Sequence, residues 1–187
     1  MSFLKELKYQ CNAMYEDGKA FWKRRGEGSL LQPLLYILTC RGWHVMILYR
    51  IGKILYALPI PVVSHLLKII FRLIHFVFGT LYGIEINPIS EIGPGFYIGH
   101  YGCIFVRGNI GKNCSISQGV SLGSKGAGKS NGWPTLGDNI YIGAGAKVLG
   151  AIHIGDNVVV GANAVVTKSV PANSLAVGVP AIFKTRQ

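Results

Sequence analysis

The stretch IYIGAGAKVLGAIHIGDNVVVGANAVV, residues 140–166, repeats itself every six residues. An aliphatic side chain returns at Ile142, Val148, Ile154, Val160 and Val166, and glycine follows three of the five. In a parallel β-helix, three short strands form one coil of about 18 residues, and glycine fits the corners, where the backbone takes conformations that a β-carbon opposes. This stretch therefore predicts a mainly β fold, a parallel β-helix of hexapeptide repeats.

The repeat continues toward the N-terminus. Ile, Leu or Val fills the same position of the repeat from Ile86 to Leu122, and again from Leu136 onward. Leu122 and Leu136 are 14 residues apart, so eight residues are inserted between them. Cys114 occupies the fifth position of its repeat, where most residues are small or β-branched. We therefore expect Cys114 to fill the core rather than to act as a nucleophile.

The insertion contains GSKGAGKS, residues 123–130, which matches the phosphate-loop pattern of nucleotide-binding proteins. A phosphate loop needs a strand before it and a helix after it. Asn131, Gly132 and Pro134 oppose a helix here, and no alternation of strands and helices surrounds the motif. Residues 124–135 are therefore predicted to form a loop at a β-helix corner, without a nucleotide triphosphate site.

Residues 1–83 lack the six-residue period. Their apolar pattern predicts helices over about 3–25, 30–57 with breaks, and 60–80. The composition changes between residues 83 and 85. We therefore expect two domains: a helical N-terminal domain, residues 1–83, and a β-helix domain, residues 84–187, with the loop insertion at 124–135.

The chain is basic. Its formal net charge is +11, and residues 1–83 hold 11 Lys and Arg against 4 acidic residues. This half is expected either to present a solvated face or to contact a membrane or an acidic ligand, and no nucleic-acid partner is predicted. The four cysteines form no C-x-x-C pair, and the first ten residues lack the apolar segment of a signal peptide. We therefore expect a cytoplasmic protein with free thiols.

Residues 60–80 combine apolar and basic side chains. His65, Lys68, Arg72 and His75 interrupt the apolar run and, at spacings of 3, 4 and 3, fall on one face of a helix. The run therefore fails the test of about 18 uncharged residues for a spanning helix. Two interpretations stay open: a peripheral contact with the inner face of the membrane, or packing against other helices or another subunit.

His100 is the histidine best placed for acid–base chemistry. It follows a corner glycine, whereas the other histidines lie in the helical half or at an outward position of the repeat. Glu85 precedes His100 by 15 residues, close to one coil, so its carboxylate is expected on a neighbouring coil, where it would orient the imidazole. The alternative is two solvated surface residues.

Several segments occur together in the order found in one family. They are GIEINPISEIGPGFYIGHYGCIFV (83–106), ISQGVSLG (116–123), the glycine-rich GKS loop, the stretch quoted first, and AVGVPA (176–181). Residues 84–183 thereby resemble the serine acetyltransferase branch of the hexapeptide acyltransferases. GWHVMILYRIGKILY, residues 42–56, resembles the helix that precedes the β-helix in this branch.

The resemblance implies a fold and a reaction. The fold is a left-handed parallel β-helix preceded by an α-helical N-terminal domain, usually assembled as a trimer or as a dimer of trimers. The reaction transfers an acetyl group from acetyl-CoA to a hydroxyl, at a cleft between adjacent subunits and without a metal. His100 matches the family's catalytic base, and Glu85 matches the aspartate that orients it.

The resemblance also implies where coenzyme A binds. Gly123, Ala144 and Ala162 match the positions at which the family's backbone approaches the pantetheine arm, and the 124–135 loop matches the one that covers coenzyme A. Lys129 and Lys168 are our own candidates for its phosphates, with solvated lysines as the alternative.

Two departures from the family concern the acceptor. Serine acetyltransferases have an acidic residue before the catalytic histidine and Arg-His-Pro after the glycine-rich loop, whereas this chain has Gly99 and Gly132-Trp133-Pro134. Because an indole stacks on sugar rings, Trp133 and Gly99 favour a glycosyl acceptor. The alternative for Trp133 is a loop anchor packed on the β-helix.

We therefore predict an acetyl-CoA-dependent O-acetyltransferase that acts on a sugar hydroxyl of a lipid-linked glycan in bacterial capsular or exopolysaccharide biosynthesis. One alternative is a serine O-acetyltransferase of cysteine biosynthesis. Another is a non-catalytic scaffold or binding protein.

Overall fold

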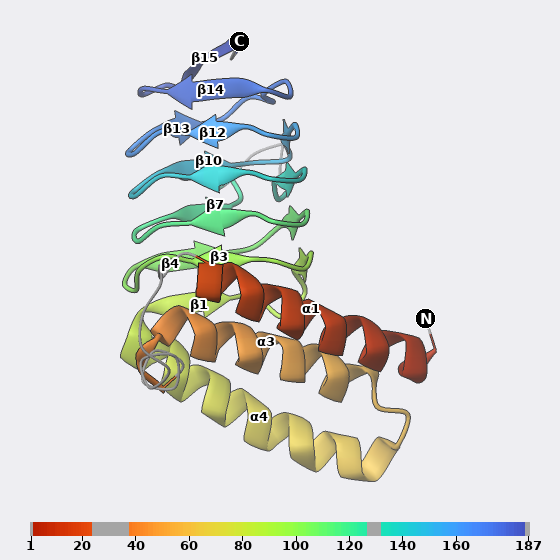
Figure 1. The fold of residues 1–187 in the computed structure, drawn as a ribbon. Coiled ribbons are helices and arrows are strands. Elements are labelled where there is room, and N and C mark those ends of the chain that lie inside the picture. Colours follow the sequence, from red (N-terminus) through yellow and green to blue (C-terminus); the bar gives the residue numbers. More distant parts are fainter. Residues whose placement is uncertain (1, 24–37, 127–131, 186–187) are drawn as a thin grey trace.

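The computed structural model describes residues 2–23, 38–126 and 132–185. Within these residues, three helices precede the strands: α1 (Phe3–Lys23), α3 (Arg41–Ala57) and α4 (Pro61–Tyr82). They lie against one end of a stack of β coils, and the C-terminus lies at the other end of that stack (Figure 1). Part of the predicted 30–57 segment and the end of the predicted 3–25 helix lie outside the described residues.

Each coil of the stack contributes one strand to each of three parallel sheets. Sheet A contains β1 (Ile84–Ile86), β4 (Ile104–Val106), β7 (Ser121–Gly123), β10 (Lys147–Leu149) and β13 (Val165–Val166). Sheet B contains β2 (Glu91–Ile92), β5 (Asn109–Ile110), β8 (Thr135–Leu136) and β11 (His153–Ile154). Sheet C contains β3 (Tyr97–Ile98), β6 (Ser115–Ile116), β9 (Tyr141–Ile142), β12 (Val159–Val160), β14 (Ser174–Val177) and the antiparallel β15 (Ile182–Thr185).

The predicted fold class is confirmed. The chain forms a mainly β parallel solenoid preceded by helices, consistent with the left-handed β-helix of hexapeptide-repeat proteins. The aliphatic residues of the repeat point inward; Ile142, Val148, Ile154 and Val160 are at most 1% exposed. The division into two domains stays a prediction, although α4 does end at Gly83, whose left-handed φ of 61° leads directly into β1.

One coil departs from the predicted period. We expected Ile104 to follow Ile98 in the same position of the repeat, but Ile104 pairs with Ile84, and Val106 pairs with Ile86 and Leu122. Partner strands β1 and β4 are therefore 20 residues apart, whereas β10 and β13 are 18 apart. The two extra residues lie in the corner between β3 and β4, and that corner carries His100.

A column of asparagines stabilises another corner, between sheets B and C. Asn113, Asn139, Asn157 and Asn173 all have φ between 56° and 59°, a left-handed conformation that asparagine tolerates better than most residues. The side-chain amides of the first three donate to the side-chain oxygen of the next asparagine, with distances of 3.3, 3.2 and 2.9 Å. These hydrogen bonds thus join four coils at this corner, in addition to the aliphatic core.

The thiol of Cys114 lies in the β-helix core, as expected. The residue is 1% exposed, and burial raises the pKa of its thiol to about 11. At pH 8 the reactive thiolate should be about 100-fold rarer than in the unfolded chain, even before exclusion of the reagent is considered. We therefore predict that iodoacetamide modifies the exposed Cys11 and Cys103 in the native protein, and Cys114 only after unfolding, as measured by peptide mass spectrometry. Rapid native labelling of Cys114 would contradict this placement.

A buried ion pair joins the helices to the first coil. The Arg50 guanidinium of α3 donates to the Asp17 carboxylate of α1 at 2.9 Å, and both side chains are fully buried. Arg50 also donates to the carbonyls of Ile92 at 2.6 Å and Gly93 at 2.7 Å. The Phe96 amide donates to Asp17 at 2.9 Å, so two helices and one coil share a single polar network.

Helix α4 turns its polar side toward the protein. Phe71 is 5% exposed and packs where Gly52 leaves room for its ring, while Arg72 donates to the Tyr56 hydroxyl at 3.1 Å and Lys68 lies over the Tyr56 ring. The segment His65–Tyr82 is long and apolar enough to cross a membrane by length and composition, with a mean hydropathy of 1.3 and 6% of its residues buried. It passes that test although it contains Lys68 and Arg72, which we expected to exclude it.

Candidate functional site

The predicted site residues gather around one face of the solenoid, sheet A. Its outward side chains form a row across the coils: Glu85, Phe105, Ser121, Lys147 and Val165. We call the corners where sheet C leads into sheet A the C–A edge, and those where sheet A leads into sheet B the A–B edge. Each coil crosses both edges, so residues far apart in sequence are stacked along them.

The C–A edge brings together the predicted base and two of the predicted coenzyme A positions. Gly99, Gly143 and Gly161 each donate a backbone hydrogen bond to the next coil, at 2.9, 2.8 and 2.8 Å. His100, Ala144 and Ala162 are the residues that directly follow them. The carbonyl of Ala144 also accepts a bond of 2.8 Å from the next corner, so Ala144 and Ala162 are stacked directly, and Gln118 occupies the coil between them and His100 in the same column.

The side chains along this column leave its backbone accessible. Ala162 and His100 are exposed, and Ala144 is half-buried. A methyl group is the largest side chain that Ala144 and Ala162 place there. An extended ligand therefore has room to lie along the C–A edge with one end near the His100 imidazole.

The A–B edge carries the remaining described candidates. Gly123 ends β7, and its carbonyl accepts a hydrogen bond of 2.8 Å from the Gly150 amide. Lys168 is exposed just beyond β13, on the same edge. Lys125, at the start of the insertion, donates to the Thr167 carbonyl at 2.6 Å and so holds the loop near Lys168. Lys129 lies outside the described residues.

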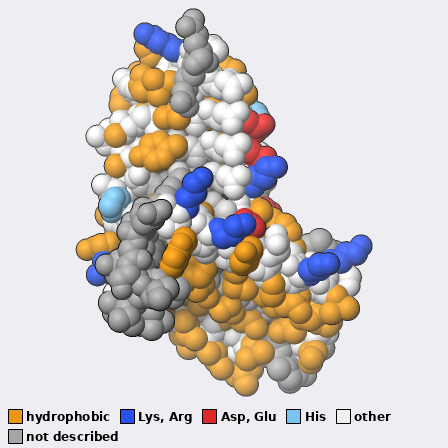
Figure 2. Space-filling model, viewed as in Figure 1, with side chains coloured by type: hydrophobic (Ala, Val, Ile, Leu, Met, Phe, Trp, Pro, Cys, Tyr) orange, Lys and Arg blue, Asp and Glu red, His pale blue; other side chains and the backbone are white. Residues whose placement is uncertain are grey.

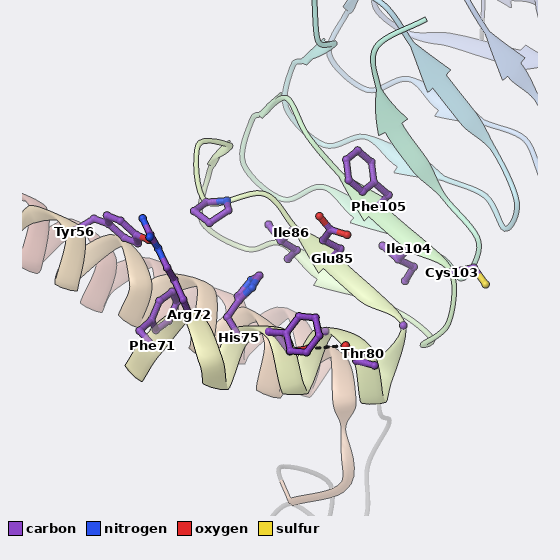
Figure 3. A pocket seen from close by; sticks show the side chains of 14 residues that line it. Tyr56, Phe71, Arg72, His75, Thr80, Glu85, Ile86, Cys103, Ile104 and Phe105 are labelled. Carbon is purple, nitrogen blue, oxygen red and sulfur yellow. Dashed lines mark hydrogen bonds between the residues drawn. The ribbon is translucent and has the colours of Figure 1, made fainter. Parts of the chain in front are cut away.

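A pocket of about 620 Å³ opens between α4 and sheet A (Figure 3). Its wall is mostly apolar but includes Arg72, His75 and Glu85, and it extends to Gly83 and Cys103 beside the corner that carries His100. Burial lowers the pKa of the His75 imidazole, and the nearby Glu85 carboxylate opposes that shift. The sequence predicted His75 on the basic face of a helix but not in the site, because only the docking of α4 on β1 brings it to Glu85.

The predicted pairing of Glu85 with His100 stays a prediction. Both side chains are exposed, and the described residues include no hydrogen bond between them. Glu85 points outward from the middle of β1, whereas His100 lies in the enlarged corner that precedes the next strand of the same sheet. The pocket residues Gly83 and Cys103 lie between these two positions.

Trp133 is anchored on the β-helix. The Arg107 guanidinium lies over the indole, 3.4 Å from its ring centre, and the Trp133 side chain is 42% exposed. Arg107 Nε is buried without a hydrogen-bond partner among the described residues, so stacking is the contact that this group makes. One indole face is therefore covered by a cation from the preceding coil, as in the loop-anchor alternative.

Metal ligation has no candidate cluster in the part of the chain that the structure describes. No three His, Cys, Asp or Glu side chains of residues 2–23, 38–126 and 132–185 converge on a point that suits an ion. The site residues are instead one imidazole, one carboxylate, several cations and accessible backbone.

Known proteins resemble this chain over most of its length. The family described as bacterial transferase hexapeptide (six repeats) matches residues 134–168. A serine acetyltransferase from Helicobacter pylori strain J99 is 40% identical over 179 residues, which cover 94% of this chain and 95% of that protein. One from Synechococcus elongatus is 40% identical over 150 residues, covering 78% of this chain and 58% of that longer protein.

Solved structures of serine acetyltransferases are also similar to this chain. Serine acetyltransferase from Brucella abortus, in complex with coenzyme A, superposes with a TM-score of 0.82 at 26% identity, covering 98% of this chain and 71% of the other. Serine acetyltransferase from Neisseria gonorrhoeae, in complex with serine, superposes with a TM-score of 0.77 at 30% identity, covering 94% and 69%.

The predicted polysaccharide acceptor is therefore wrong. The relatives that match nearly the whole chain are serine acetyltransferases, which favours the serine alternative over a sugar or a lipid-linked glycan. The physical reason lies at Trp133, which we expected to stack on a sugar ring. In the fold Arg107 covers one face of its indole and brings a positive charge there.

Proposed function

Because the chain belongs to the hexapeptide-repeat acyltransferase family, in which its full-length relatives are serine acetyltransferases, we propose that it transfers the acetyl group of acetyl-CoA to the hydroxyl of L-serine. The observation that carries the proposal is the 40% identity to the Helicobacter pylori enzyme across 95% of that protein. The column of His100, Ala144 and Ala162 supports it independently, because it joins a general base to an accessible backbone edge.

In the proposed reaction His100 is the general base. A ring nitrogen takes the serine hydroxyl proton as the oxygen attacks the thioester carbonyl carbon, and a C–O bond forms. The tetrahedral intermediate then breaks its C–S bond, and the imidazolium returns the proton to the departing thiolate of coenzyme A. The products are O-acetylserine and coenzyme A, and no step needs a metal.

The carboxylate of Glu85 is proposed to stabilise the imidazolium. An acidic neighbour holds an imidazole in one tautomer and favours its protonated form as the hydroxyl proton arrives. Glu85 lines the pocket together with Cys103, which belongs to the same corner as His100.

Coenzyme A is proposed to lie between the C–A edge of one subunit and the A–B edge of the adjacent subunit. Its pantetheine arm would follow Ala144 and Ala162 on the C–A edge, and Gly123 would approach it at the end of β7. Lys129 and Lys168 remain candidates for its phosphates. The exposed position of Lys168 and the attachment of the loop at Lys125 support a cationic site near this end of the solenoid.

Arg107 is proposed to bind the carboxylate of serine. The family's arginine at the loop is replaced here by Gly132, next to Trp133. The Arg107 guanidinium lies over the Trp133 ring and so provides a cation close to the position from which one was lost.

In the proposed trimer, or dimer of trimers, the C–A and A–B edges that form one site come from adjacent subunits, and Gly99 and Trp133 face the acceptor. We place this enzyme in the cytoplasm.

The acceptor test uses the full chain, acetyl-CoA and three conditions: L-serine, L-alanine and no acceptor. We expect O-acetylserine and free coenzyme A in equal amounts with serine, and no transfer to alanine, which has the same charges but lacks the hydroxyl. Products are measured by mass spectrometry and chromatography, because the free cysteines would react with a thiol dye. Coenzyme A binding without serine turnover would refute the acceptor, and failure to bind coenzyme A would support the scaffold alternative.

A further inference from the structure

Helix α4 presents an apolar face to solvent. We define this apolar face by nine side chains, each between 36% and 71% exposed: Leu66, Leu67, Ile69, Ile70, Leu73, Ile74, Phe76, Val77 and Leu81. Surface helices of soluble proteins normally bury such a stripe and expose their polar side. Here the order is reversed, because Lys68, Arg72 and His75 face the protein.

The apolar face lies on the outer side of the molecule. Among the three helices, α4 is the outermost, with α3 between it and α1 (Figure 1). Hydrophobic side chains cover most of the lower part of the surface, where the helices lie (Figure 2). A continuous exposed patch of this kind marks a binding surface for a partner or a membrane.

The apolar face has no free hydroxyl that a partner would have to hydrogen-bond. Thr80 is the one hydroxyl residue among the exposed side chains of residues 66–81, and it donates to the Phe76 carbonyl of its own helix at 2.8 Å. Protein interfaces usually carry about one hydrogen bond for every 100–200 Å². A partner that offers hydrocarbon without directional contacts therefore fits this face better than a second protein surface.

Charge distinguishes an anionic lipid surface from a second copy of the chain. The sequence contains no Asp or Glu from Gly28 to Ile84, whereas Lys68 and Arg72 belong to α4 itself. In a symmetric contact through α4, the two copies would bring their cations together with no acid of α3 or α4 between them. Arg72 is exposed beside the apolar face, and anionic headgroups would supply the negative charge that it lacks there.

We propose that α4 lies in the headgroup region of an anionic phospholipid membrane, with its apolar face in the acyl chains and the β-helix projecting into the cytoplasm. The helix lies on the membrane and does not cross it, because its inner side packs on α3 through Phe71 and Gly83 leads directly into β1. This peripheral contact is independent of the acceptor and of the acetyl transfer reaction.

Vesicle flotation of the full chain tests the proposal. Vesicles of phosphatidylcholine with about one third phosphatidylglycerol are compared with phosphatidylcholine alone. We expect the protein to float with the anionic vesicles, and more weakly as salt is raised. The variant Leu66→Gln, Leu73→Gln, Leu81→Gln should bind more than about tenfold more weakly, because each side chain contributes burial that glutamine lacks.

A matched control keeps the same chemistry on another surface. Ile89→Gln, Val179→Gln and Ile182→Gln replace side chains that are 72%, 71% and 63% exposed on the β-helix, and this triple variant should float like the natural chain. If the α4 variant does not fold, hydrogen exchange of residues 66–81 in the natural protein replaces it, and anionic vesicles should slow that exchange.

Three results would overturn the proposal. The natural chain could stay in the aqueous fraction, or the α4 variant could float as well as the control. Light scattering could instead show that the α4 substitutions split an oligomer while neither protein floats, which would assign the apolar face to a second copy. Serine-dependent acetyl transfer in solution should persist in both triple variants, so failure of this proposal leaves the proposed function intact.

Discussion

Replacing His100 with alanine should lower the rate of acetyl transfer to serine by about 10²–10⁴-fold, the range expected when a positioned general base is lost. The hydroxyl of serine is a weak nucleophile until its proton is removed, and no other histidine lies on the C–A edge among the described residues. Affinity for coenzyme A should change little, because the backbone column of Ala144 and Ala162 is untouched. Steady-state kinetics and calorimetric titration with coenzyme A measure the two quantities separately.

His153 provides the matched control for this experiment. It is also an exposed histidine on the β-helix, but it lies on β11 in sheet B, away from the outward row of sheet A. His153→Ala should keep its turnover within about twofold of the natural chain, since it removes no group from the proposed acid–base step. Unchanged turnover in His100→Ala would remove His100 from the proposed reaction, and equal losses in both variants would indicate a structural effect.

The six-residue period predicted the solenoid because each coil repeats one physical requirement. An inward aliphatic residue and a tight corner are needed in every strand, so Ile142, Ile154 and Val160 report the fold without tertiary information. The six-residue pattern did not predict the enlarged corner at His100, because Ile104 is aliphatic and fits the pattern although it is paired in another register. The six-residue pattern therefore predicts that the coils exist better than it predicts which corner contains two extra residues.

The residues proposed to bind the acceptor are positioned by contacts between coils. The sequence around a single residue does not show such contacts. Trp133 was interpreted alone, and its partner Arg107 lies 26 residues earlier in the sequence. His75 reaches Glu85 only through the docking of α4 on β1. The orientation of α4 was open for a related reason, since an amphipathic pattern predicts two faces but not which one meets the protein.

The buried Arg50–Asp17 pair was also invisible in the sequence, because charged residues on two helices are usually solvated. Replacing Arg50 with methionine should lower the free energy of unfolding by about 3–5 kcal/mol, the cost of leaving one buried charge without its partner. The carbonyls of Ile92 and Gly93 lose their donors in the same variant. Lys19→Ala, which breaks an exposed pair with Glu16 on α1, should leave urea unfolding almost unchanged.

The decrease in the free energy of unfolding caused by Arg50→Met should depend on pH in a defined direction. Burial raises the pKa of the Asp17 carboxyl, and Arg50 opposes this effect, so removing Arg50 raises that pKa further. A carboxyl whose pKa is raised by folding favours the folded state below that pKa and disfavours it above. The difference in unfolding free energy between the natural chain and Arg50→Met should therefore be smaller near pH 5 than near pH 8.

Adding Asp17→Leu to Arg50→Met separates the cost of the orphaned charge from the loss of shape. The double variant has no buried charge, so it should regain part of the stability, but not all of it, because the Phe96 amide and two carbonyls still lack partners. A loss below about 1 kcal/mol in Arg50→Met would contradict the burial of the pair. Full recovery in the double variant would instead show that the helices dock on the first coil through shape alone, with no need for these hydrogen bonds.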